Sequence, residues 1–398
     1  MGILLLIIGL LLFIGLVVVH EFGHFLAARR GGVDVEEFGI FFPPRLFKKR
    51  MKGGWDFTIN ALPLGGFVKL KGEHDSDKGK GAYGAASTGT KVKIMLAGVF
   101  MNLVAALALF TLLALIGMPK LIENQFTVAS DTKVVASKVL IGYLEPQSPA
   151  SKAGLEVRDQ ILSIGGTCAD LCDFQDSVPL RQIQSTKDLQ AATAAYAGKD
   201  VKVVYARGGK TLSTHARMRT DAVVDASNKT DNPKGHLGIQ PAAFSMQRST
   251  WSAPVVAVGL SAQLTALTYQ GLWHAVSGLG GIFAGFFTGN HTARQHAQTA
   301  ASSQVSGPVG IFVILKDGSL LGYQFMLLII AVISLTLAIM NVLPIPALDG
   351  GRLFLLLISR LFRKQFSPKA EETIIGAGFA VLMSLIIVIT IVDVKRFF

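Results

Sequence analysis

Four stretches without charged side chains constrain this chain more than any other feature of its sequence. They cover residues 2–19, 94–118, 325–347 and 373–392 of the 398-residue chain. A helix needs about 20 consecutive apolar residues to cross the hydrocarbon core of a bilayer. We therefore expect a polytopic α-helical membrane protein with four transmembrane helices. The composition agrees, because 16% of the residues are charged, against roughly 25% in soluble domains.

The distribution of lysine and arginine predicts the orientation of these helices. Residues 29–93 hold 13 of the 38 basic residues, whereas the much longer segment 118–323 holds 18. Short loops that are rich in lysine and arginine face the cytoplasm, whereas long domains translocate with little regard to their charge. We expect the N-terminus and segment 118–323 outside the cytoplasm, with 29–93 and 352–369 inside. The net charge of +12 then places basic loops near anionic lipid, and we expect no nucleic-acid partner.

The sequence His20-Glu21-Phe22-Gly23-His24 ends the first uncharged stretch and fits the pattern H-E-x-x-H. Residues four apart lie on one face of a helix, so His20 and His24 can bind one zinc ion. Glu21 can accept a proton from a water molecule held by that ion. Ionisable residues at the end of a membrane helix are energetically costly and usually functional. The sequence therefore predicts a zinc site at the inner end of the first span.

The best candidate for a third zinc ligand is Asp349. A catalytic zinc usually takes three protein ligands. Asp349 follows Pro344 and Pro346, which break the third span and free backbone groups. Non-helical backbone at membrane depth is tolerated only where it is buried in protein or lines a wet cavity. His74 lies in a polar loop and fits a solvated residue better, and the remaining histidines lie in the external segment.

The segment 249–293 is ambiguous because it contains no Asp, Glu, Lys or Arg. It is long enough to cross a bilayer, but glutamines, His274 and many glycines dilute its apolar character. It could lie on the membrane surface, re-enter the membrane or add a span. Asp349 reaches the two histidines only if the first and third spans run in the same direction. We therefore expect this segment to cross the bilayer either twice or not at all.

The two motifs together make the chain resemble the site-2 protease family of intramembrane zinc metalloproteases, and within it the bacterial regulator-of-sigma-E protease group. That family pairs H-E-x-x-H with N-x-x-P-x-P-x-L-D-G, which is complete here at residues 341–350. The resemblance implies zinc as cofactor, His20, His24 and Asp349 as its ligands, and Glu21 as the catalytic base. It also implies cleavage of a single-span membrane protein in or near its transmembrane segment. The implied substrates are an anti-sigma factor, at the second cut of regulated intramembrane proteolysis, or signal-peptide remnants.

Residues 57–70 resemble the membrane-associated β-hairpin that follows the first span in this family. Two β-prone runs, 55–60 and 67–70, flank a Pro-Leu-Gly-Gly sequence, as expected of a hairpin. An exposed strand there could pair with an unwound substrate, or the hairpin could only plug the cavity or anchor at the interface. The candidate substrate-binding residues are Gly65, Gly66, Asn341, Pro344 and Pro346. Gly98 and Asn102 resemble the family's G-x-x-x-N, for which we expect packing and hydrogen bonding between helices.

The external region resembles one bacterial PDZ domain of the protease-associated type. The resemblance rests on a Val-rich strand within 134–165, strands at 199–206 and 210–216, and a closing strand at 235–239. Such a domain could bind an external peptide or substrate domain by strand addition, or act as a steric filter. Cys168 and Cys172 lie in an apparent insertion, where a disulfide is favoured outside the cytoplasm. Free thiols remain an alternative for this pair.

The predicted protein is a multi-pass zinc endopeptidase of the bacterial cytoplasmic (inner) membrane, with lipid bilayer and single-span substrate as partners. Two alternatives are a catalytically idle membrane scaffold that uses its PDZ domain, and a transporter with broken helices, which would show internal repeats. The predicted segments are the first transmembrane helix with H-E-x-x-H (1–28), a cytoplasmic loop with the β-hairpin (29–93), the second transmembrane helix (94–118), the PDZ domain (119–245), amphipathic or interfacial helices and a linker (246–323), the third transmembrane helix (324–361) and the fourth (373–393).

Overall fold

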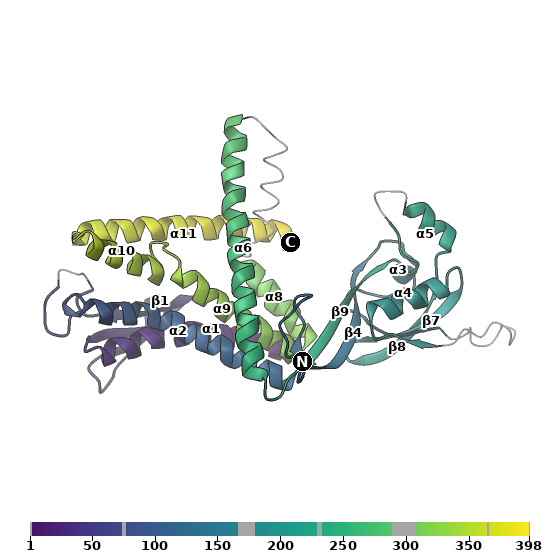
Figure 1. Ribbon diagram of the computed structural model, residues 1–398, viewed down its shortest axis with the longest axis horizontal. Helices are drawn as coiled ribbons and strands as arrows, with labels where there is room; N and C mark the ends of the chain where they lie inside the picture. Colours follow the sequence, from purple (N-terminus) through teal and green to yellow (C-terminus); the bar gives the residue numbers. More distant parts are fainter. Residues whose placement is uncertain are drawn as a thin grey trace. The chain divides into compact units, whose positions relative to one another are not determined.

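The computed structural model describes residues 2–73, 77–165, 180–228, 233–288, 308–363 and 366–397. The chain forms two compact units (Figure 1). Unit 1 combines Met1–Ile116, Asn124–Asp131 and Ser249–Phe398, and unit 2 combines Gly117–Glu123 with Thr132–Arg248. The predicted cysteine pair and His74 lie outside the described residues.

Unit 1 is largely helical. Its helices are α1 (Gly2–Arg30), α2 (Thr88–Ile116), α6 (Ala253–Thr288), α8 (Pro308–Leu321), α9 (Tyr323–Val342), α10 (Asp349–Leu361) and α11 (Pro368–Phe397), with a 3-10 turn η1 at Tyr83–Ala85. Five of the described helices, α1, α2, α6, α9 and α11, are long and apolar enough to cross a membrane. The sequence predicts four spans, and the described helices include five candidates. The additional candidate, α6, lies in the ambiguous segment 249–293.

The predicted third transmembrane helix (324–361) folds as two helices rather than one. The α9 helix ends at Val342, and α10 begins only at Asp349. Both prolines lie in the non-helical segment between them, because proline lacks the amide hydrogen that a helix interior requires. The break that the two prolines predict therefore lies directly before the candidate zinc ligand.

Close contacts through glycine fix the packing of α1. A side chain at Gly23 would collide with the backbone of Ala97 on α2, and one at Gly9 would collide with Met326 on α9. Small residues let helix backbones approach in this way, which favours tight packing inside a membrane. Leu16, Leu315 and Met326 are buried in one cluster shared by α1, α8 and α9.

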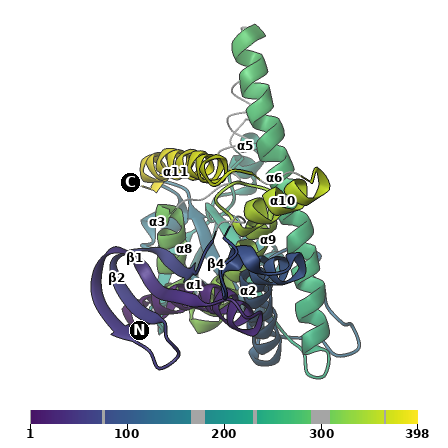
Figure 2. The ribbon, with the colours of Figure 1, turned by 90° about the vertical axis from the view of Figure 1, so that its left-hand side faces the viewer.

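The α6 helix has a different direction from the other long helices. It runs crosswise to α1, α2 and α11 in both Figure 1 and Figure 2. Its start is anchored where the Ser249 amide donates to the carbonyl of Ala114, near the end of α2 (2.7 Å). Its candidate span Ala253–His274 has a mean hydropathy of 1.2, whereas the other four candidates reach at least 2.6.

A small curled sheet follows α1 and lies beside it in Figure 2. It consists of β1 (Val35–Arg50) and β2 (Asp56–Leu70), which pair antiparallel with many register shifts. Residues 38–40 of β1 pair with 66–68 and also with 57–59. The two β-prone runs predicted from the sequence are therefore both strand, but β1 lies between them. Sequence reasoning had not assigned this central strand.

Unit 2 is an α/β unit around a seven-stranded sheet, in the order β3-β9-β4-β5-β7-β8 with β6 paired to β5. The strands are β3 (Met118–Pro119), β4 (Lys133–Leu144), β5 (Gln160–Gly165), β6 (Arg181–Gln182), β7 (Asp200–Arg207), β8 (Lys210–Arg217) and β9 (Ile239–Arg248), with helices α3 (Pro149–Lys152), α4 (Thr186–Ala195) and α5 (Asp221–Ser227). Val139, Ile161 and Val203 are fully buried in its own core. β9 begins at Ile239, where the sequence predicts the closing strand to end, because Gly238 adopts φ +74° and turns the chain.

Candidate metal centre

The two motif histidines lie on one face of α1, near its C-terminal end. The Nε2 atoms of His20 and His24 are 3.2 Å apart, and the rings meet edge to face with centroids 4.8 Å apart. A helix places residues four apart one above the other, so an unbroken α1 is sufficient to create this pair.

Asp349 reaches the pair because the backbone turns sharply between α9 and α10. A side chain at Gly350 would collide with the carbonyl oxygens of Val342 and Leu343, and one at Gly351 would collide with that of Ile345. The two glycines thus let the first turn of α10 close over the end of α9. Asp349 lies in this first turn, where the helix dipole favours a negative charge.

The three side chains form a compact set of possible metal ligands. The Oδ2 atom of Asp349 lies 3.1 Å from Nε2 of His20 and 3.2 Å from Nε2 of His24. Bonds of about 2.0–2.1 Å in a tetrahedral zinc site put ligand atoms roughly 3.3 Å apart. The same oxygen is buried and makes no hydrogen bond, so a metal ion between it and the two nitrogens would satisfy it. The donor set therefore fits zinc, and it is the one such cluster among the described residues.

Both imidazoles are oriented by α2. The Nδ1 atom of His24 lies 2.7 Å from the carbonyl oxygen of Ile94, which can only accept, so Nδ1 carries the proton and leaves Nε2 free for a metal. Nδ1 of His20 lies 3.2 Å from the Asn102 amide nitrogen, while Oδ1 of Asn102 is buried without a partner. Rotating that amide satisfies both groups, because Oδ1 then accepts from a protonated Nδ1. His20 thereby adopts the same tautomer as His24.

Gly98 and Asn102 lie closer to the site than the sequence suggested. A side chain at Gly98 would collide with both imidazole rings, so only glycine leaves room for them. The main chain of Asn102 is itself held by Ser334 of α9, whose hydroxyl donates to the main-chain carbonyl oxygen of Asn102 at 2.8 Å. Both residues thus pack or hydrogen-bond between helices, and they contact the histidines of the candidate metal cluster directly.

Glu21 lies against the curled sheet. A side chain at Gly66 would come within 3.0 Å of Cγ of Glu21 and 3.2 Å of the carbonyl oxygen of Gly39. A glycine in β2 thus lets the backbone of this strand pass beside the predicted catalytic base. Residues 66–70 pair with β1 on one side, and no second strand partner occurs in the described part of the chain.

The remaining predicted residues are less close to the cluster. Asn341 lies in the last turn of α9, and Pro344 is exposed in the interrupted segment. Pro346 packs against Gly378 of α11. The structure also adds a participant that no side-chain pattern could reveal, the backbone carbonyl of Ile94.

Comparisons with known proteins identify the family. The model of peptidase family M50 matches residues 8–385. A Clostridium perfringens protein named as a zinc metalloprotease is 30% identical, over 98% of this chain and 98% of its own length. A similarly named Campylobacter jejuni protein is 28% identical over 96% and 90%, and an Enterococcus faecalis protein named as a protease is 25% identical over 96% and 97%. The chain therefore belongs to peptidase family M50 and is an intramembrane zinc metalloprotease of the site-2 protease type.

Proposed function

We propose that the enzyme cleaves a single-span membrane protein within or near its transmembrane segment, with Glu21 as the base and His20, His24 and Asp349 as the zinc ligands. The observation that carries the proposal is the convergence of these three ligand atoms beside a strand whose backbone passes next to Glu21. By family resemblance, the substrate is an anti-sigma factor already shortened outside the membrane, or a signal-peptide remnant.

The residues divide the chemical work between them. Zinc bound by the cluster would polarise the scissile carbonyl and acidify a water molecule. Glu21 removes a proton from that water and passes it to the amide nitrogen that leaves. Asn102 and the Ile94 carbonyl keep Nε2 of both histidines directed at the metal.

The strand of β2 that passes Glu21 is well suited to hold an unwound substrate. A helical segment satisfies its amides internally, so a protease has to bind it in an extended form. The unpaired side of residues 66–69 offers backbone groups for strand addition, whereas the Leu70 amide already donates to the Glu73 carboxylate at 3.0 Å. Gly65 and Gly66 carry no side chains that would keep such a strand away from Glu21. We assign Asn341, Pro344 and Pro346 to the same substrate channel, because they lie in the last turn of α9 and in the non-helical segment that leads to Asp349.

We also propose four membrane crossings, with α6 along the membrane surface. The bond between His24 and Ile94 puts the start of α2 at the metal cluster, so α2 runs away from it. The α9 helix runs towards the cluster, because Asp349 follows its end. The chain between α2 and α9 must then cross an even number of times. The crosswise course of α6 in Figures 1 and 2 and its low hydropathy favour a surface helix.

In this arrangement the N-terminus and unit 2 lie outside the cytoplasm, and the active site faces the cytoplasmic side of the bacterial inner membrane. The positive-inside distribution of basic residues supports this orientation. We assign unit 2 to the PDZ class on its resemblance and on its antiparallel sheet with a separate core. It would admit substrates with small external parts, or bind their new C-termini.

The test compares the wild type with Glu21→Gln on a labelled single-span substrate in detergent micelles, with zinc content measured in both. We expect equal zinc in the two proteins and a fall of about 10²–10⁴-fold in cleavage for Glu21→Gln, as for loss of a general base. The matched control is Glu123→Gln, an exposed glutamate of unit 2, which should cleave like the wild type. Full activity of Glu21→Gln, or wild-type protein that holds zinc and cuts no shortened substrate, would contradict the proposal.

A further inference from the structure

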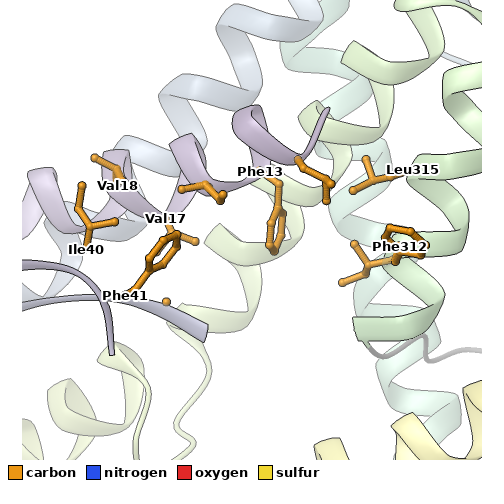
Figure 3. A pocket seen from close by; sticks show the side chains of 11 residues that line it. Phe13, Val17, Val18, Ile40, Phe41, Phe312 and Leu315 are labelled. Atoms are coloured by element: carbon orange, nitrogen blue, oxygen red, sulfur yellow. The ribbon is translucent and has the colours of Figure 1, made fainter. Parts of the chain in front are cut away.

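An apolar cavity lies in unit 1 (Figure 3). Its volume is about 230 Å³, and its walls come from α1, α8 and the curled sheet. None of its lining side chains is polar. A cavity of about 150 Å³ with such a lining holds a benzene ring, so this one has room for a side chain as large as leucine or phenylalanine.

The cavity lies close to Glu21, through Val17 and Gly65. Val17 lines it and lies four residues before Glu21, which puts the two side chains on one face of α1. Gly65 also lines it, and the adjacent Gly66 approaches both Glu21 and Val17. Alternate side chains of an extended peptide are roughly 7 Å apart on one face. A substrate strand along β2 would therefore direct a side chain near the scissile bond into this cavity.

Two of the cavity walls are held in place by specific polar contacts. Phe41 adopts φ +68°, a region that bulky residues rarely occupy, and its carbonyl accepts a hydrogen bond from the buried Asn60 at 3.0 Å. The first turn of α8 is held by Asp393 of α11, which accepts from the Gly310 amide at 2.8 Å. Backbone strain that the surroundings maintain is typical of binding sites. Phe312 lines the cavity from α8 (Figure 3) and is 43% exposed.

We infer that this cavity is the subsite that selects an apolar side chain of the substrate's transmembrane segment, close to the scissile bond. The inference rests on the proposed function, since it takes the substrate to lie extended along β2. The occupant is a large aliphatic or aromatic side chain, because no lining group could pair with a charged or amide side chain. The subsite would make the enzyme choose among positions in an otherwise uniformly apolar segment.

The first test measures cleavage of a single-span substrate series carrying Ala, Leu, Phe or Trp at each position near the cut. For wild type we expect one position at which Leu or Phe exceeds Ala by about 10–100-fold in kcat/KM, as for filling an apolar pocket. Ile14→Trp, which fills the cavity, should bring that ratio to about 1. Phe312→Ala, which enlarges it, should move the preference to Trp. Ile7→Trp, an exposed position on the same helix outside the cavity, should leave the ratio unchanged.

Equal ratios in the wild type and both cavity variants would overturn the inference. So would an equal loss of rate with all four side chains, which would mean that lipid or simple packing fills the cavity.

A second measurement does not need catalysis. In a Glu21→Gln protein with Cys168→Ser and Cys172→Ser, Phe312→Cys should form a disulfide with a substrate cysteine at the selected position under mild oxidation, and Ile7→Cys should not. Absence of this cross-link overturns the inference. If the cross-link forms although the wild-type protein cuts no substrate, the cavity still binds the substrate side chain, but the proposed cleavage is wrong. The two failures are therefore distinguishable.

Discussion

The two units of this protein differ in the side chains that they expose. In unit 1, Ile3 is 78% and Leu11 62% exposed, whereas Asn102 and Ser334 are at most 1% exposed. In unit 2, Val139 and Val203 are fully buried, and charged residues at the ends of β7 and β8, such as Asp200, Lys210 and Arg217, are exposed. Each unit has the side chains that its surroundings demand: hydrocarbon around the helices and water around the sheet. The difference also explains where chemistry is possible, since the interior of unit 1 is polar enough to hold a metal.

We expect the largest effect from a substitution that fills the space beside the two histidines in unit 1. In Gly98→Ala, the new methyl group would collide with the rings of His20 and His24. We expect zinc affinity to fall by at least about 10–100-fold, the range found when the partners of metal ligands are altered, and cleavage to fall with it. Zinc content and cleavage rate, both measured on purified protein, check this prediction.

Gly89→Ala is the matched control for this change. Gly89 lies in the first turn of the same helix, and a side chain there would meet nothing within 4 Å. Zinc binding and cleavage should remain at the wild-type level. If both variants lost zinc equally, the glycines of α2 would be needed for the flexibility of the helix. The space that Gly98 leaves for the imidazoles would then not be the explanation.

Sequence reasoning succeeded where one local pattern is sufficient. Each of the four uncharged stretches lies largely within a long apolar helix, because length and hydropathy decide whether a helix suits a bilayer. His20 and His24 converge because one helix carries both. Asp349 required more, since 325 residues separate it from His24 in sequence, but the paired motifs already indicated its place.

The features that were missed depend on contacts between distant segments. The charged run from Arg45 to Arg50 gives β1 no alternating pattern, so its place between two halves of β2 could not be predicted. The closeness of Gly98 to the histidines depends on how α1 and α2 cross. The backbone carbonyl of Ile94 has no residue-type signature at all.

We expect an intermediate effect from removing the partner of a buried acidic side chain in unit 2. Asp159 is 1% exposed, and Arg207 donates to both of its carboxylate oxygens at 2.7 and 2.6 Å. Arg207→Ala would leave that buried carboxylate without its cation, and one hydrogen bond from the Glu156 amide (2.8 Å) would remain. Because the Arg207 side chain is itself about a third exposed, we expect a loss of about 1–3 kcal/mol, towards the lower end of values for broken buried pairs.

Hydrogen exchange of the β5 and β7 amides in the full-length protein measures this loss. Arg217→Ala, an exposed arginine of the neighbouring strand β8, is the matched control and should leave exchange unchanged. Zinc content should be normal in both variants, since the two units have separate interiors. A loss of zinc in Arg207→Ala would show that the stability of unit 2 affects the metal site of unit 1.

The smallest effect concerns the point where the chain returns from unit 2 to unit 1. The carboxylate of Asp131 accepts hydrogen bonds from the side chains of Ser252 and Thr250 and from their amides, just before α6 begins. These bonds lower the pKa of Asp131 below its ordinary value. A carboxylate with a lowered folded pKa stabilises the fold above its unfolded pKa of about 3.9, and this stabilisation is lost as the pH falls through the folded value.

We therefore expect the exchange protection factors of the Ser252 and Val256 amides to be constant from neutral pH down to about pH 4.5 and to fall only in more acidic solution. Asp131→Asn should lower protection already at neutral pH and remove the acid step, because its amide cannot ionise and offers one acceptor oxygen instead of two. Asp200→Asn, at an exposed aspartate of unit 2, should change neither. An acid step that persists in Asp131→Asn would assign the titration to another group.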